Sequence, residues 1–407
     1  MSRTTYPEAA SAANATQGRR PDPVAKAREL VSLLRVEAAY TEERGSLSEE
    51  SEAALREAGF FALFAPRRLG GYEADLHTAV DVFAELARGC AASGWVAMLL
   101  SGGSYFVSLL GGQAALDVWE QDPGAAVCEA SAPTGSARPV ADGVVVSGRW
   151  QPVSGIRQAR WAMVGVLTFD EDGQVVDQGM ALIPLADGTI EHTWHVAGMQ
   201  GTGSETFVVQ EVFVPAHRVL SLPKVMAGYY AASHADEPLY TATLSSFSVL
   251  AVAAPVLGMA EAALEHTRKL LADGKAIGGS TYQDAAQSPT VQLNLADSAS
   301  KIDGARLHIL RGVADVERAV AEGAPLDEGA RARVRMDVAA AVGSARDAVR
   351  LLVNIGGTGG FALDRPVQRI WRDLEVASRH YMLNTDLSRE IYGRALLGIE
   401  PQVTHMV

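Results

Sequence analysis

The chain has 407 residues, of which 48% are hydrophobic, and its formal net charge is −13. This length and apolar content allow a large buried core divided among two or three domains. The acidic balance argues against nucleic acid as a partner. The only two cysteines, Cys90 and Cys128, provide neither a disulfide framework nor a metal cluster, so we expect a reducing, cytoplasmic setting and no metal.

Two segments bear on targeting. Residues 1–22 are rich in Ala, Ser, Thr and Arg and lack an apolar stretch, which predicts a disordered tail rather than a signal peptide. The longest apolar run, residues 247–260, contains Pro255 and is shorter than the roughly 20 residues that a membrane helix needs. We therefore expect a buried helix there and no membrane partner.

The first two domains differ in their pattern. Residues 23–124 show helical spacing and predict an N-terminal helical domain, in which the small and apolar run 93–110 is typical of a fully buried helix. Residues 125–222 favour short strands separated by turn signals such as Asp142-Gly143, which indicates a β-barrel or sandwich. Within them, residues 131–136 read as a Pro-Gly loop.

Residues 223–407 return to helical spacing. Four amphipathic stretches, 245–273, 289–323, 327–354 and 366–397, predict a C-terminal four-helix bundle. Glycines within residues 356–360 separate the last two of these stretches. Near the end of the final stretch lies His380, and its sequence context alone fits a capping or packing residue as well as an acid-base group.

This order of helices, strands and helices resembles the acyl-CoA dehydrogenase fold over residues 25–398. Three motifs carry the resemblance: GRWQPVSG at 148–155, GMQGTGSETFVVQEVFVP at 198–215 and NIGGTGGF at 354–361. The resemblance implies an N-terminal helical domain, a middle β-domain and a C-terminal helical bundle.

Two branches of that fold differ in their chemistry. The dehydrogenases usually carry a catalytic carboxylate shortly after an Arg-Asp pair like Arg372-Asp373, and residues 376–381 contain none. Some members place the base in an earlier helix, so an acyl-CoA dehydrogenase using Glu261 or Glu265 remains an alternative.

Residues 369–398 instead resemble the oxygenase components of two-component flavin-dependent monooxygenases. This resemblance implies that a separate flavin reductase, a transient partner, supplies reduced FMN or FAD. With O2 the flavin forms a C4a-hydroperoxyflavin that hydroxylates an aromatic or polyketide-like small molecule. N-oxygenation of an amino sugar and a non-catalytic scaffold stay open as alternatives, and a homotetramer is expected by analogy.

The resemblance also implies roles for individual residues. His380 corresponds to the acid-base histidine beside the flavin, and Ser154 to the hydroxyl residue that meets the flavin N5. The segments around them offer further contacts to the cofactor, although hairpin and loop turns explain the same residues. The candidate cofactor-binding residues are Ser131, Thr134, Ser154, Thr202, Ser204, Gly356 and Gly357.

One departure from the monooxygenase pattern concerns the substrate. Phenol hydroxylases of this branch often carry a histidine in the helix after a Ser-Gly-Trp motif, but residues 101–105 read SGGSY. The paired glycines leave space for a larger or differently held substrate. The candidate substrate-binding residues are Gly103, Tyr105, Tyr381 and Asn384.

Overall fold

The computed structural model describes residues 22–230, 234, 236–400 and 403–404, and the tail predicted at 1–22 lies outside them except for Asp22. The carboxylate of Asp22 caps the first helix by accepting from the Val24 amide at 3.0 Å. The N-terminal helices are α1 (Pro23–Arg44), α2 (Glu49–Glu57), α3 (Leu76–Gly89), α4 (Ala91–Leu110) and α5 (Gly112–Trp119).

A seven-stranded sheet follows. Its strands are β1 (Val127–Val140), β2 (Gly143–Val153), β3 (Trp161–Phe169), β4 (Val175–Pro184), β5 (Thr189–Glu191), β6 (Glu205–Pro215) and β7 (Val219–Ser221). They run in the order β5-β6-β2-β1-β3-β4-β7, and the β1–β3 pair is parallel whereas the other pairs are antiparallel.

The loop predicted at residues 131–136 is wrong. These residues belong to β1, whose pairing with β3 shifts register between Ala130 and Gly135. The extra residues form a bulge, which local turn signals mimic because a bulge also breaks the regular ladder. The strand therefore continues through the Pro-Gly segment and bends at the point where it borders the candidate site.

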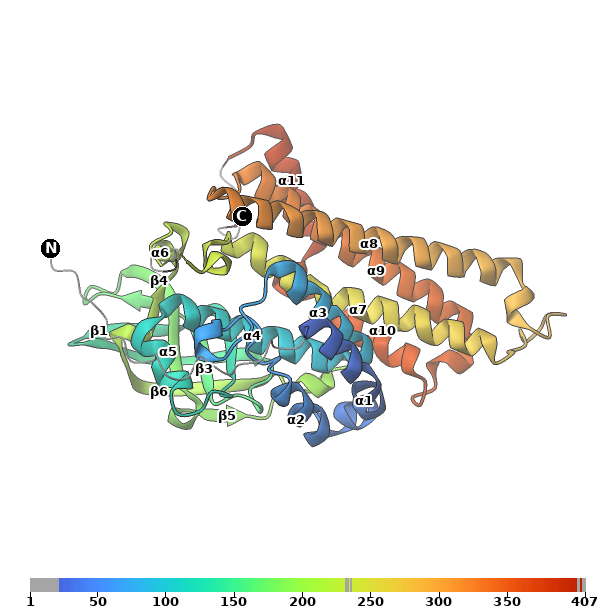
Figure 1. Ribbon diagram of the computed structural model, residues 1–407, viewed down its shortest axis with the longest axis horizontal. Helices are drawn as coiled ribbons and strands as arrows, with labels where there is room; N and C mark the ends of the chain where they lie inside the picture. Colours follow the sequence, from blue (N-terminus) through green and yellow to red (C-terminus); the bar gives the residue numbers. More distant parts are fainter. Residues whose placement is uncertain (1–21, 231–233, 235, 401–402, 405–407) are drawn as a thin grey trace.

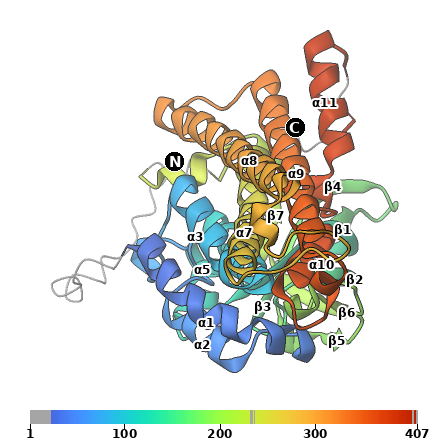
Figure 2. The ribbon, with the colours of Figure 1, turned by 90° about the vertical axis from the view of Figure 1, so that its right-hand side faces the viewer.

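The remaining helices are α6 (Leu222–Met226), α7 (Leu244–Ala272), α8 (Pro289–Glu322), α9 (Glu328–Gly356), α10 (Pro366–Ala377) and α11 (Thr385–Leu397). Helices α7, α8 and α9 extend away from the sheet (Figure 1), whereas α11 projects from the body of the molecule (Figure 2).

The single helix predicted over 366–397 is in fact two. A short 3-10 turn, Tyr381–Leu383, separates α10 from α11. Two side chains hold this break: the His380 ring accepts from the Met382 amide at 3.4 Å, and Asn384 Oδ1 caps α11 by accepting from Leu387 at 3.0 Å. His380 thus occupies a corner between helices, where its ring can leave the helix surface.

Helix α4 is the central element. It is buried except at Gly102 and Leu110, and it packs against both β1 and α7. Gly103 explains its close approach to the sheet, because a Cβ there would lie 2.1 Å from the Val127 carbonyl oxygen. Helices α4 and α7 are long and apolar enough to cross a membrane, but 89% and 83% of those stretches are buried inside the protein.

Candidate active site

A cavity of about 360 Å³ lies between α4, β1, β2, α7 and the connection from α10 to α11. This volume falls within the roughly 300–1,000 Å³ typical of small-molecule sites. Aromatic and aliphatic side chains form most of the wall. Polar groups are interspersed among them: Tyr105, Glu129, Ser131, Thr134, Gln151, Ser154, Ser248, Arg379, His380 and Tyr381.

The cavity brings together Ser154 and His380, which are far apart in the sequence. Ser154 directly follows the last residue of β2, and His380 lies in the corner after α10. Ser131, Thr134, Tyr105 and Tyr381 border the same cavity. Six of the candidate residues that the sequence suggested are therefore gathered around one space.

A chain of three buried hydroxyls stands behind Ser154. Each hydroxyl has one proton to donate, and Thr202 Oγ1 donates its proton to the Met199 carbonyl at 2.8 Å. Thr202 must then accept from Ser204, whose Oγ is 2.6 Å away, and Ser204 must accept from Ser154 at 2.7 Å. The Ser154 proton is committed inward, so its oxygen offers the cavity a hydrogen-bond acceptor.

Residues 197–199, which precede the hydroxyls of Thr202 and Ser204, are hydrogen-bonded to α10. The Asp373 carboxylate accepts from the Met199 amide at 2.5 Å, and the Arg372 guanidinium donates to the Ala197 carbonyl at 2.8 Å. Gly198 allows the approach, since a Cβ there would lie 2.2 Å from the Arg372 carbonyl oxygen. Burial raises the pKa of Asp373 to about 7. The Arg-Asp pair thus ties the last domain to the β-domain.

His380 is held in a defined tautomer. Its Nδ1 accepts from the Met382 amide, so the neutral ring carries its proton on Nε2. The ring lies edge-on to Trp95, with centroids 5.5 Å apart, and against Tyr381 at 4.7 Å. Burial lowers the pKa of His380 to about 4, which keeps the imidazole neutral near pH 7.

Two tyrosines add hydroxyls to the wall. Tyr381 shares a hydrogen bond with Ser131, whose oxygens lie 2.9 Å apart, and burial raises the pKa of Tyr381 to about 12. Burial also raises the pKa of Tyr105. The Tyr105 ring stacks on Phe247, with centroids 4.8 Å apart. Both phenols therefore stay protonated near neutral pH and can donate hydrogen bonds.

Among the described residues, Glu129 is the one carboxyl on the cavity wall, and sequence reasoning missed it. Within the described part of the chain it makes no hydrogen bond or ion pair, and burial raises its pKa to about 8. A signal was present, because Glu129 stands alone in the otherwise small and apolar run of residues 125–132. An unpaired acid that the surrounding protein desolvates is costly unless it serves a site.

Other candidate residues lie outside the cavity lining. Gly103 packs on β1, and Asn384 caps α11. Thr202 and Ser204 act through Ser154. Gly356 borders a separate cleft with Lys275, whose ammonium donates to the Gly356 carbonyl, and Gly357 begins the turn that follows.

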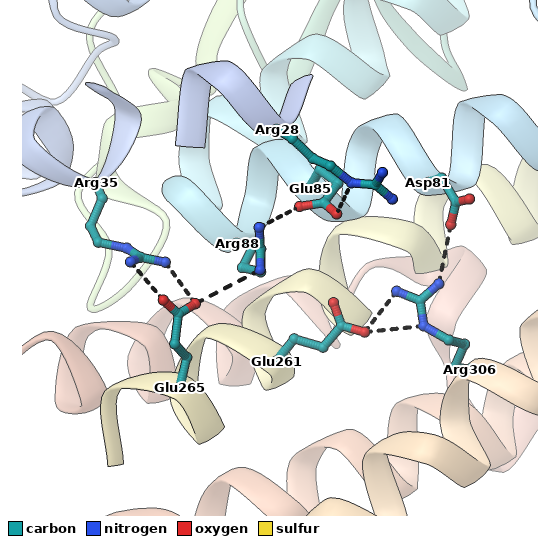
Figure 3. A network of polar contacts seen from close by, with 8 residues as sticks. All are labelled: Arg28, Arg35, Asp81, Glu85, Arg88, Glu261, Glu265 and Arg306. Atoms are coloured by element: carbon teal, nitrogen blue, oxygen red, sulfur yellow. Dashed lines mark hydrogen bonds and ion pairs between the residues drawn. The ribbon is translucent and has the colours of Figure 1, made fainter. Parts of the chain in front are cut away.

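The two carboxylates considered as dehydrogenase bases are engaged elsewhere. Glu265 forms two hydrogen bonds with Arg35, at 2.8 and 2.9 Å, and Glu261 pairs with Arg306 at 2.7 Å (Figure 3). Arg306 also pairs with Asp81 at 3.1 Å. Neither Glu261 nor Glu265 borders the cavity. Their arginines hold both groups in a network between α1, α3, α7 and α8.

Comparison with known proteins decides between the branches. Residues 25–116 match the acyl-CoA dehydrogenase N-terminal domain, and residues 250–385 match the acyl-CoA dehydrogenase C-terminal domain. The chain is 33% identical to the oxygenase component of an FADH2-dependent resorcinol hydroxylase from a Rhizobium species, over 92% of this chain and 93% of that protein.

The chain belongs to the oxygenase components of the flavin-dependent monooxygenases. A second member, the oxygenase subunit HsaA from Rhodococcus jostii, is 32% identical over 91% of this chain and 97% of its own. The structure of XiaF from a Streptomyces species, in complex with FADH2 and glycerol, superposes with a TM-score of 0.90 at 29% identity, covering 95% of this chain and 97% of that one. The predicted fold and the predicted monooxygenase branch are confirmed.

Proposed function

We propose that this chain hydroxylates an aromatic small molecule, using O2 and a reduced flavin that a separate reductase supplies. The observation that carries the proposal is the meeting of an acceptor hydroxyl, Ser154, and a neutral imidazole, His380, on one largely apolar cavity. Reduced flavin, when bound, would supply the activation of O2 for transfer of one oxygen atom to the ring.

The residues of the cavity fit a reduced rather than an oxidised flavin. In the reduced ring N5 carries a hydrogen, whereas in the oxidised ring N5 is itself an acceptor. Ser154 offers only a lone pair, because its proton is committed to Ser204. We assign Ser154 to N5, with Ser131 and Thr134 as the neighbouring polar contacts.

His380 would act on the substrate side. A pKa of about 4 makes the ring a weak base at neutral pH, and its Nε2–H is a ready donor. We therefore assign His380 to hold and orient the substrate oxygen, and to move a proton there as the oxygen is transferred. This role favours hydrogen-bond donation over abstraction of a phenol proton in the resting site.

The walls favour an aromatic substrate over an amino sugar. Phe64, Phe106, Phe247, Leu99 and Val252 border the cavity, and apolar walls of this kind exclude water and bind rings. Excluding water also protects activated oxygen from being lost as hydrogen peroxide. An amino sugar would leave most of its hydroxyls unpaired against these side chains.

The assembly and setting complete the proposal. Exposed leucines on the long helices and on the last helix support a homotetramer, with Leu293, Leu307 and Leu396 between 65% and 69% exposed. Gly356 and Gly357, near the end of α9, would contact the cofactor in that assembly. Two free, buried cysteines fit a cytoplasmic setting.

Oxygen labelling tests the function. The purified chain, mixed with chemically reduced flavin and ¹⁸O2, should add one labelled atom to a hydroxyarene from a substrate panel, as read by mass spectrometry. No reductase is needed, since the flavin is reduced beforehand. Oxidation of an acyl-CoA from a parallel panel, without label in the product, would overturn the proposal.

A further inference from the structure

Glu129 occupies space that α4 leaves open for it. A Cβ on Gly102 would lie 2.8 Å from Glu129 Oε1, so any larger residue at position 102 would compete with the carboxyl. Val127, two residues earlier on β1, packs on Gly103 from the same face of the strand. The two glycines therefore have separate uses, one for packing and one for admitting the Glu129 side chain.

Among the residues that the structure describes, the cavity wall offers Glu129 no free cation. In the described part of the chain, Arg379 is the only lysine or arginine on the cavity wall, and it pairs with Glu375 at 2.6 Å with over half of its side chain exposed. The other titratable groups bordering the cavity are Tyr105, His380 and Tyr381. All three are neutral near pH 7, because burial raises the pKa of each phenol and lowers the pKa of the imidazole.

We propose that Glu129 determines substrate specificity: it binds a hydroxyl group of an uncharged aromatic substrate and excludes substrates that carry a carboxylate. This inference rests on the proposed function and names its substrate class. A protonated carboxyl can both donate to and accept from a hydroxyl. A substrate carboxylate would have to give up its hydration at a wall that offers it no free counter-ion, and this desolvation cost disfavours its binding even where the protonated Glu129 donates to it.

The arrangement also gives the substrate two polar contacts. Glu129 borders the cavity from β1 and His380 from the corner after α10, and apolar side chains of α4 and α7 border it as well. A hydroxyarene held at Glu129 by one hydroxyl can direct a second polar group to His380, which borders the same cavity. Because Glu129 and His380 come from different domains, together they fix the orientation of the substrate as well as select its identity.

A matched ligand pair tests the inference by equilibrium binding to the purified full chain, without turnover. Naphthalene-2,6-diol and 6-hydroxy-2-naphthoate share a ring and one hydroxyl and differ in charge. Wild-type protein should bind the diol at least about tenfold more tightly, and Glu129→Gln should reduce that preference to below about threefold. Ser248→Ala, which alters another polar group on the wall, should leave the ratio unchanged.

Gly102→Ala supplies an independent variant, because its methyl group displaces the Glu129 carboxyl and should weaken diol binding. An unchanged ratio in Glu129→Gln, a wild-type preference for the naphthoate, or binding of neither ligand would overturn the inference. Anaerobic binding of reduced flavin to the same samples separates failure of the Glu129 inference from failure of the proposed function. Intact flavin binding with an unchanged ligand ratio rejects only the role of Glu129, whereas absent flavin binding rejects the proposed function.

Discussion

The hydroxyl oxygens of Ser154 and Ser204 lie 2.7 Å apart, and the proton between them belongs to Ser154. Its direction follows from Thr202, which donates to the Met199 carbonyl and so can only accept from Ser204. A backbone carbonyl distant from the cavity thereby decides that Ser154 is an acceptor where it borders the site. Buried hydroxyl chains with a fixed end have one proton order.

Breaking this order should weaken discrimination between flavin redox states. In Thr202→Val, Ser204 loses its acceptor and can rotate, so Ser154 regains the freedom to donate. We expect the preference for reduced over oxidised flavin to fall about threefold to tenfold, the worth of roughly one hydrogen bond. Anaerobic fluorescence titration measures both affinities.

Thr206→Val is the matched control for that variant. Thr206 is also buried on the same segment, but its hydroxyl pairs with Thr193 at 2.6 Å, away from Ser154. The preference of Thr206→Val for reduced over oxidised flavin should equal that of the wild type. Equal losses in both valine variants would mean that general loosening of the segment, rather than proton order, sets the preference.

Removal of His380 should uncouple oxygen consumption from hydroxylation. His380→Ala deletes the Nε2 donor, and the loss of a positioned proton-transfer group typically costs about 10² to 10⁴ in rate. Product formation should fall by that order while hydrogen peroxide release rises and reduced flavin still binds. His266→Asn, on α7 and outside the cavity, is the control and should hydroxylate normally.

The pH dependence of stability should report Glu129. Burial raises its pKa from 4.5 to about 8, so between these values the unfolded chain loses a proton that the folded chain keeps. Stability from this group is therefore lost as pH rises through that window, by at most about 1.4 kcal/mol per pH unit. Glu129→Gln removes the effect.

Thermal melts from pH 5 to pH 8 measure this directly. The difference in Tm, variant minus wild type, should grow as the pH rises, because only the wild type acquires the penalty. Asp373 and His380 titrate in both proteins, so their contributions cancel in the difference. A flat difference would show that Glu129 is ionised and solvated in the folded chain.

Glu265 should affect stability and not chemistry. Glu265→Gln removes its two-point pairing with Arg35, at 2.8 and 2.9 Å, in a partly exposed network. We expect a loss on the order of 0.5–1 kcal/mol in the free energy of unfolding, and an unchanged rate of hydroxylation. Loss of activity together with intact folding would revive a catalytic role for this carboxylate.

Periodicity and motif reading recovered the arrangement of the fold because its signals are local. The buried helix α4 and the strand Trp161–Phe169 follow directly from runs of apolar residues. The bulge at Ala130–Gly135 and the corner at His380 were missed, because a bulge and a loop share turn residues and the corner lacks glycine and proline.

For the candidate site too, local motifs predicted some residues, whereas contacts between distant segments were not predictable. The resemblance supplied Ser154 and His380, but the direction of the Ser154 hydrogen bond depends on Thr202 and Met199 across a turn. The importance of Glu129 depends on Gly102, which belongs to another element. Contacts between distant segments carry both findings, and a single sequence does not encode them in any local pattern.

The most direct test of the central claim is an anaerobic titration of wild type and Ser154→Ala with reduced and oxidised flavin. The wild type should bind the reduced form at least about tenfold more tightly, since only that form donates from N5 to the Ser154 oxygen. Ser154→Ala should lose most of this preference. Equal affinity of the wild type for both forms, or a preference that survives in the alanine variant, would contradict the account.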